Sequence, residues 1–345
     1  MRAAIYHAFQ KPLTVTTVPD PVLSDDGIIL EIKANGICRS DWHGWMGHDP
    51  MISLPHVPGH EMAGVILEVG SEVKNWQVGN RVTLPFCLGC GVCAECRAGF
   101  QNICDVDYQP GFSAWGSFAQ YIAIPRAEAN LICLPEEIDF IEAASLGCRF
   151  MTAFHSVVDQ GHLKAGEWLA VHGCGGVGLS AIMIASALGA QIIAIDIDDS
   201  KLEFAKIIGA TALINAKNID PVQAIKDLTQ GGAHVSIDAL GSAITSRNSI
   251  QSLRKRGRHV QIGLTLAEDS GVTVPMYEVL AKELTIVGSH GLQAHRYPDM
   301  LQMIVSGKLR PKRLIGKTVN LEQAGDELAR MGHFAQHGVT VINQF

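Results

Sequence analysis

The sequence of 345 residues contains no uninterrupted apolar run long enough for a membrane-spanning helix, which needs roughly 18 residues. Its first residues also lack the long apolar stretch of a secretory signal peptide, so a cytoplasmic location is expected. Positive charge is scarce, because 27 Lys and Arg face 34 Asp and Glu and leave a net charge of −7. This balance argues against general binding to nucleic acid or to an acidic membrane.

The rest of the composition is that of an ordinary globular protein, with 47% hydrophobic and 18% charged residues. The length predicts about two domains. The nine cysteines, in a chain without a secretion signal, are expected to be metal ligands or free thiols rather than disulfides. Five of them lie between Cys87 and Cys104, which favours a metal site in that segment.

A glycine-rich turn joins the apolar run 168–172 to the apolar, helix-like segment 179–188. This order of strand, turn and helix is typical of a dinucleotide-binding site. The glycines permit a tight turn, close approach of the backbone to a pyrophosphate and close packing of the helix, whose free N–H groups face the phosphates. The expected cofactor-binding residues of the turn are Gly173, Gly175, Gly176, Val177 and Gly178.

A second apolar strand, residues 191–195, ends at Asp196. An acidic residue roughly 20 positions past the glycines is expected to accept a hydrogen bond from a ribose 2′-hydroxyl. Its carboxylate would repel the extra phosphate of NADP, so NAD is the predicted cofactor. The helix that follows is expected to begin with a capping box formed by Ser200 and Glu203 and to end at Gly209.

The two halves of the chain differ in pattern. Residues 1 to about 85 alternate apolar runs with Pro and Gly, which predicts a β-rich region without helix-length periodicity. From about residue 151, strands alternate with helices, which predicts βαβ units and a parallel sheet.

Within this second half, the segment 254–258 is interpreted as the cationic end of a helix stopped by Gly257 rather than as a nucleic-acid site. Beyond about 292, a helix near 299–306 and a final strand at 339–342 are expected.

Four cysteines follow the spacing Cys-x2-Cys-x2-Cys-x7-Cys at Cys90, Cys93, Cys96 and Cys104. Four thiolates can close a tetrahedral site around Zn²⁺ and leave no open position, which is the arrangement of a structural zinc site. It would stabilise a lobe at about 87–105 that has little core of its own. A register that begins at Cys87 is an alternative. We prefer the later set because a ligand from outside the tight loop helps to complete a tetrahedron.

A second group of possible ligands is dispersed along the chain. Cys38 follows a predicted strand, His60 and Glu61 lie in a Pro- and Gly-rich turn, and Cys148 precedes the dinucleotide unit. Two thiolates and an imidazole, with a fourth position left open, would make a catalytic zinc site.

Taken together, these motifs resemble those of the zinc-dependent alcohol dehydrogenases of the medium-chain dehydrogenase/reductase superfamily. The resemblance covers essentially the whole chain and rests on Cys38-x-Ser-Asp-x-His43, Gly59-His-Glu61, the four-cysteine lobe, Cys148 and the glycine turn, in the family's order. It implies an α/β protein with a β-rich, GroES-like catalytic domain at 1–150 plus 291–345. It also implies a Rossmann domain with a doubly wound parallel sheet at 151–290, and an active site in the cleft between the domains.

The resemblance also implies roles for individual residues. The catalytic zinc ligands would be Cys38, His60 and Cys148, with Glu61 able to coordinate the ion transiently. Asp41 resembles the carboxylate that orients the ligand imidazole, Ser40 the hydroxyl that contacts the substrate alcohol, and His43 the imidazole that passes a proton to solvent. Among cofactor contacts, Arg39 resembles a pyrophosphate ligand, Thr152 a nicotinamide neighbour, and Lys201 a ribose ligand beside Asp196.

The implied activity is the NAD-dependent interconversion of an alcohol and an aldehyde or ketone, by hydride transfer from a zinc-bound alkoxide, with two zinc ions per subunit. The ordinary pKa of a histidine suits the relay assigned to His43. An alternative is a relative specialised for polyol, amino-alcohol or thiol-adduct substrates. A more remote one is a zinc-binding regulatory or nucleic-acid-binding protein, which the acidic charge disfavours. A homo-oligomer, dimer or tetramer, is expected by analogy with the family.

Overall fold

The computed structural model describes residues 1–265, 271–333 and 338–345 and divides the chain into two compact units. The first unit consists of residues 1–151, 291–307 and 311–345, and the second of residues 152–290 and 308–310. Within the described ranges, every helix is too short or too polar to cross a membrane.

The second unit contains a six-stranded sheet in which all neighbouring strands run parallel. The first strand of this unit lies in the middle of the sheet. The next two strands lie on one side of it, and the chain then crosses over, so that the remaining three strands lie on the other side. This is the doubly wound order of dinucleotide-binding domains, and the predicted Rossmann sheet is confirmed. In spatial order the strands are β10 (Ala212–Asn215), β9 (Gln191–Asp196), β8 (Trp168–His172), β11 (Ala233–Asp238), β12 (Leu253–Gln261) and β13 (Thr285–Gly288). The helices between them in the chain are α6 (Gly176–Ala187), α7 (Asp199–Ile208), α8 (Pro221–Thr229), α9 (Ala243–Gln251) and α10 (Met276–Lys282).

The start of α7 differs from the prediction. The helix is capped by Asp198, whose carboxylate accepts hydrogen bonds from both the backbone N–H and the hydroxyl of Ser200. Ser200 is therefore inside the helix, and the predicted capping box of Ser200 and Glu203 is wrong. The predicted end is correct, because Gly209 closes the helix with a φ of 136°, which glycine adopts without strain.

The cationic segment 254–258 also differs from the prediction. Helix α9 ends at Gln251, and the chain continues directly into β12, so the predicted helix end at Gly257 is wrong. Leu253 and Val260 are fully buried in the sheet. Their burial outweighs the local helix preference of the arginines and lysine between them.

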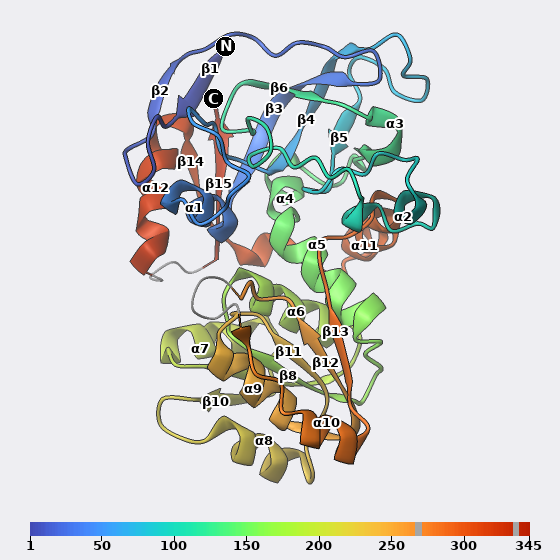
Figure 1. Cartoon of the computed structure of the whole chain (residues 1–345), viewed down its shortest axis with the longest axis vertical. Coiled ribbons are helices and arrows are strands. Elements are labelled where there is room, and N and C mark those ends of the chain that lie inside the picture. The colour runs from blue at the N-terminus through green and yellow to red at the C-terminus, as the bar shows by residue number, and fades with distance from the viewer. Residues whose placement is uncertain (266–270, 334–337) are drawn as a thin grey trace. The chain divides into compact units, whose positions relative to one another are not determined.

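The first unit contains a seven-stranded sheet and a small sheet of β1 (Arg2–Ile5) and β2 (Thr14–Thr17). The larger sheet joins both ends of this discontinuous unit, because β15, near the C-terminus, lies between β14 and β3 (Figure 1). Its strands are, in spatial order, β14 (Ile315–Asn320), β15 (Val339–Gln344), β3 (Ile28–Ile37), β4 (Glu61–Val69), β5 (Arg81–Thr83) and β7 (Ile132–Cys133), with β6 (Tyr121–Ile124) also paired to β3. The helices are α1 (Arg39–Met46), α2 (Ala94–Arg97), α3 (Ala127–Asn130), α4 (Phe140–Ser145), α5 (Cys148–Phe154, which runs past the end of the first segment of this unit), α11 (Tyr297–Val305) and α12 (Ala324–Arg330).

Several elements of the first unit escape sequence reasoning, among them α1, β14 and α12. Helix α1 buries only Asp41 and Gly44, so it has no apolar stripe to reveal it. Strand β14 buries only Val319, and α12 is two turns long. The predicted helix and strand of the C-terminal segment correspond to α11 and β15, both of which carry buried apolar residues.

Two glycines of the turn after β8 provide a matched test of packing. A Cβ atom at Gly178 would lie 1.8 Å from the Gly173 carbonyl oxygen, whereas one at Gly175 would meet nothing in the described chain within 4 Å. We expect Gly178→Ala to lower the free energy of unfolding by about 1–3 kcal/mol, because α6 must shift away from β8. Gly175→Ala should cost much less. Thermal unfolding of both variants checks this, and equal losses would contradict the assigned packing role.

Candidate zinc sites and dinucleotide-binding turn

A lobe of the first unit brings four cysteines together. The sulfur atoms of Cys90, Cys93, Cys96 and Cys104 lie within 4.8 Å of one another. This all-thiolate donor set fits a tetrahedral structural zinc ion. Cys87, the alternative ligand, is buried outside the group, and burial raises the pKa of its thiol. The structure therefore brings together the cysteines of the preferred register, which ends at Cys104, and leaves Cys87 out.

Backbone N–H groups of this lobe favour the thiolate form of Cys90 and Cys93, whose pKa values are lowered. Cys93 caps α2, and its sulfur accepts a hydrogen bond from the Cys96 N–H at 3.4 Å. The sulfur of Cys90 accepts from the N–H groups of Val92 at 3.5 Å and Cys93 at 3.3 Å. These donors stabilise the anion and lower the pKa of Cys90 to about 6.

A second cluster lies where β3 ends and β4 begins. Cys38, His60, Glu61 and Cys148 each offer a ligand atom, and these atoms lie within 4.8 Å of one another. The two strands pair antiparallel with Gly36 opposite Glu61, so the residues just beyond β3 meet those just before β4. Cys148 joins them from the first turn of α5. Two sulfurs and an imidazole in one buried cluster match the donor set predicted for a catalytic zinc ion.

The carboxylate of Asp41 organises this cluster. It accepts hydrogen bonds from the backbone N–H of Cys38, the backbone N–H of Gly59 and Nδ1 of His60, each at 2.9 Å. Because Nδ1 carries the proton, the other ring nitrogen, Nε2, is free to bind a metal. That nitrogen is buried and has no hydrogen-bond partner in the described part of the chain. An unpaired buried nitrogen among two sulfurs is what a missing metal ion would satisfy.

Glu61 is held beside the cluster by a residue that sequence reasoning missed. The guanidinium of Arg149 donates to Glu61 Oε2 and, at 3.0 Å, to the carbonyl of Ile37. Burial raises the pKa of Glu61 to about 8, and the Arg149 charge opposes that rise. Space for the pair comes from two glycines, because a Cβ at Gly36 would lie 2.1 Å from Glu61 Oε2 and one at Gly147 would lie 2.4 Å from Glu61 Cβ. The sequence contained one sign of this role, because Arg149 is a lone charged residue beside Cys148 in an otherwise apolar stretch.

The residues expected to contact substrate and proton lie on α1. Ser40 is half-buried in its first turn, and His43 follows one turn later. Burial, followed by the charges of Arg39 and His48, lowers the pKa of His43 to about 4. The expectation of an ordinary histidine pKa is therefore wrong, and the imidazole is neutral near pH 7. Its Nδ1 lies 3.1 Å from Nδ1 of His48.

Arg39 is fixed within the first unit. Its guanidinium lies 3.8 Å from the centre of the Trp42 ring and donates a hydrogen bond to the Met331 carbonyl. This stacking holds a cation at the start of α1. The expected pyrophosphate contact from Arg39 remains a prediction.

The glycine turn of the second unit has the backbone that a dinucleotide requires. Gly173 has a φ of +99°, and Gly175 lies beside open space in the described chain. No side chain of the described residues caps α6, so the N–H groups of its first turn are available to phosphate oxygens. Asp196 stabilises the turn, because its carboxylate accepts from the Cys174 N–H at 2.7 Å.

The remaining predicted cofactor residues occupy the elements next to this turn. Gly176 and Val177 open α6, and Lys201 lies in the first turn of α7, after the strand that ends at Asp196. Thr152 is buried in α5. Their contacts with a cofactor remain predictions.

Comparison with known proteins supports both the fold and the metal chemistry. Residues 24–136 match the family model of the alcohol dehydrogenase GroES-like domain, and residues 176–306 that of zinc-binding dehydrogenases, so the predicted fold class is confirmed. An alcohol dehydrogenase of Geobacillus stearothermophilus is 34% identical over 334 residues, which cover 96% of each chain. The alcohol dehydrogenase TADH from Thermus sp. ATN1 superposes with a TM-score of 0.92 at 30% identity, over 100% of both chains. A zinc-binding dehydrogenase from Sinorhizobium meliloti 1021, bound to NADP, has a TM-score of 0.88 at 27% identity and covers 99% of this chain and 98% of its own.

The cysteine register can be tested with a pair of variants. We expect Cys104→Ala to lose one zinc ion per chain and to lower the unfolding temperature, because the lobe then lacks a closed metal site. Cys87→Ala should keep its full zinc content. Atomic emission of the purified proteins, together with thermal unfolding, gives both readings. Loss of zinc from the Cys87 variant alone would favour the earlier register.

The role of Asp41 leads to a second prediction for this region. Asp41→Asn should weaken zinc binding at the second cluster about 10- to 100-fold, because the amide no longer fixes the His60 tautomer with a full negative charge. Zinc release to a colorimetric chelator measures the effect. Asp49→Asn is the control, since Asp49 accepts from the Met51 N–H outside the cluster. Equal release from both variants would contradict the orienting role.

Proposed function

The chain belongs to the zinc-dependent alcohol dehydrogenase family of medium-chain dehydrogenases/reductases, and from this premise we propose that it uses NAD and two zinc ions per subunit. Its reaction class is the interconversion of an alcohol with an aldehyde or ketone. The observation that carries the proposal is the buried cluster of Cys38, His60 and Cys148, with the imidazole oriented by Asp41 and its Nε2 left unpaired.

Each residue of the cluster has a defined task in this proposal. Cys38, Cys148 and Nε2 of His60 would hold the ion. Zinc bound there supplies Lewis-acid chemistry that lowers the pKa of an alcohol and polarises a carbonyl. Asp41 keeps the proton on Nδ1 of His60 and so preserves the ligand nitrogen. Glu61 lies beside the ligands, and Arg149 compensates its negative charge whenever the carboxyl group is ionised.

The proton leaves the substrate through α1. The Ser40 hydroxyl would accept a hydrogen bond from the substrate alcohol, and the imidazole of His43 would pass the proton toward solvent. Because the pKa of His43 is lowered to about 4, its ring is neutral near pH 7 and one of its two nitrogens carries no proton. A proton taken up there is released readily.

The cofactor preference rests on Asp196. Its carboxylate is anchored by the N–H groups of Cys174 and Ile197, at 2.7 and 2.8 Å, so a negative charge is fixed at the end of β9. A fixed anion favours a free ribose 2′-hydroxyl over a 2′-phosphate, and hence NAD over NADP. NAD held there would supply the hydride-acceptor chemistry.

The test is the initial rate of NADH formation with a panel of primary, secondary and cyclic alcohols, polyols and amino-alcohols. We expect Cys148→Ala to reduce kcat/KM on the order of a thousandfold, because Lewis-acid stabilisation worth several kcal/mol is lost. Cys133→Ala is the matched control, since Cys133 is an exposed cysteine outside both clusters. Zinc content and thermal unfolding show whether each variant is folded.

Equal turnover by the Cys148 and Cys133 variants would overturn the assignment of Cys148 as a ligand. A higher kcat/KM with NADP than with NAD would contradict the role of Asp196. Turnover limited to polyols or amino-alcohols would keep the mechanism and select the specialised alternative.

A further inference from the structure

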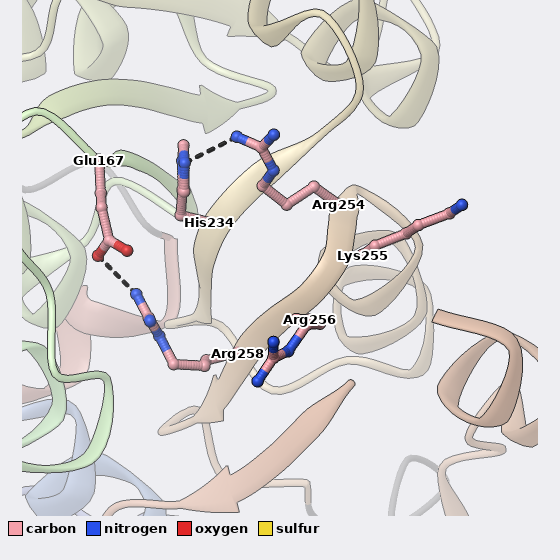
Figure 2. A pocket seen from close by; sticks show the side chains of 6 residues that line it. All are labelled: Glu167, His234, Arg254, Lys255, Arg256 and Arg258. Carbon is pink, nitrogen blue, oxygen red and sulfur yellow. Dashed lines mark hydrogen bonds and ion pairs between the residues drawn. The ribbon is translucent and has the colours of Figure 1, made fainter. Parts of the chain in front are cut away.

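A pocket of about 330 Å³ lies in the second unit, apart from the groups described above. It is lined by Glu167, His234, Arg254, Lys255, Arg256 and Arg258 (Figure 2). Four of these side chains are cations and one is a carboxylate, in a protein whose net charge is −7. Such a local excess of positive charge focuses a field that attracts anions.

The pocket lies at the opposite edge of the sheet from the glycine turn. Glu167 immediately precedes β8, His234 is the second residue of β11, and the four cations lie between the second and the sixth residue of β12. These three strands are parallel neighbours, so the pocket lies at their amino ends. The glycine turn follows the carboxyl end of β8, where doubly wound sheets bind dinucleotides. The pocket is therefore not part of the proposed cofactor site.

A bulge in β12 sets the directions of the cationic side chains. Leu253 pairs with Ala233 and Arg258 pairs with Val235, so a single residue of β11 faces the four residues 254–257. Arg256 adopts a φ of +60° within this bulge. Gly257 fits there because a Cβ would lie 2.9 Å from the Arg254 carbonyl oxygen. Bulges of this kind redirect side chains.

The hydrogen bonds of His234 indicate that the pocket needs a hydrogen-bond acceptor. The backbone N–H of Trp168 donates to Nδ1 at 3.0 Å, so Nδ1 carries no proton and the ring is neutral. Burial, followed by the charge of Arg254, also lowers the pKa of the ring. The proton must then sit on Nε2. Nε2 lies 2.7 Å from Nη1 of Arg254, which can only donate. Two N–H donors therefore face each other and require a shared acceptor.

A second unsatisfied donor lies on the other side of the pocket. Arg258 pairs with Glu167 through Nη2 at 2.5 Å, but its Nε is buried and has no hydrogen-bond partner among the residues that the structure describes. The Glu167–Arg258 and His234–Arg254 pairs and Arg256 line the same pocket, while in Figure 2 Lys255 extends away from the other five. Donors thus approach this space from several directions.

We propose that this pocket binds a phosphate group, with one oxygen accepting from both Arg254 and Nε2 of His234 and others from Arg258 and Arg256. A tetrahedral dianion suits donors from several directions better than a planar carboxylate, and guanidinium groups bind phosphate oxygens in pairs. One oxygen beside the two nitrogens can accept from both Arg254 and His234, which resolves their conflict. The phosphate could come from free phosphate or pyrophosphate, or from a phosphorylated metabolite.

The experiment is isothermal titration calorimetry of the full-length, zinc-loaded protein at constant ionic strength. The probes are inorganic phosphate, inorganic pyrophosphate and glycerol 3-phosphate. Arg254→Gln and Arg258→Gln each remove one donor group. Lys217→Gln is the matched control, because Lys217 is an exposed cation of the same unit outside the pocket. Arg254→Lys keeps the charge but removes the guanidinium, and thermal unfolding establishes that each variant is folded.

We expect at least one probe to bind at this pocket, and Arg254→Gln to weaken that binding by roughly tenfold or more, the loss typical of one charge-assisted hydrogen bond. Lys217→Gln should bind as the wild type does. Binding at the glycine turn would survive in the Arg254 variant and is counted separately by stoichiometry. Tighter binding of glycerol 3-phosphate than of phosphate would identify a phosphate ester as the ligand, and equal or weaker binding a free anion.

Several results would overturn the proposal. One is no binding of any probe, and another is binding that the Arg254 and Arg258 variants leave unchanged. Equal weakening by Lys217→Gln would show a diffuse charge effect and not a site. If the probes fail to bind and Arg254→Gln dissociates an assembly in sedimentation velocity, the acceptor is an acidic group of a second copy of this chain.

Discussion

The carboxylate of Asp41 is the group on which the proposed zinc chemistry depends. It is almost fully buried, and its three donors come from the start of α1, from the turn before β4 and from the imidazole of His60. A buried carboxylate is tolerated only when such donors satisfy it, so the position of each donor is coupled to the other two. The same three bonds fix the tautomer of His60. Local backbone geometry and metal affinity are therefore set by one side chain.

Glycine supports function in this chain for three different physical reasons. Gly175 leaves room for a ligand, Gly178 leaves room for a neighbouring carbonyl, and Gly36 leaves room for the Glu61–Arg149 ion pair. Only the first is a matter of binding, while the other two concern packing between elements. Each of these glycines is therefore explained by a different neighbour and not by one shared role.

Sequence reasoning succeeded where the determining residues are close in the chain. The spacing of Cys90 to Cys104 and the turn from Gly173 to Gly178 are local patterns, and the alternation of strands and helices led to the Rossmann sheet. It missed Arg149 because its partner, Glu61, lies 88 positions away. It misassigned the segment 254–258 because the burial of Leu253 and Val260 depends on neighbouring strands. The lowered pKa of His43 likewise depends on burial and on the packing of α1, which no local pattern indicates.

The place of β15 in the sheet of the first unit has a consequence for synthesis. This strand, Val339–Gln344, pairs with β3 and β14 and is synthesised long after β3. The second unit lies between β3 and β15 in the chain and can fold as a complete unit before β15 is made. The sheet of the first unit stays incomplete until β15 has been synthesised. Cys38, a proposed metal ligand that directly follows β3, is therefore made long before its final surroundings are complete.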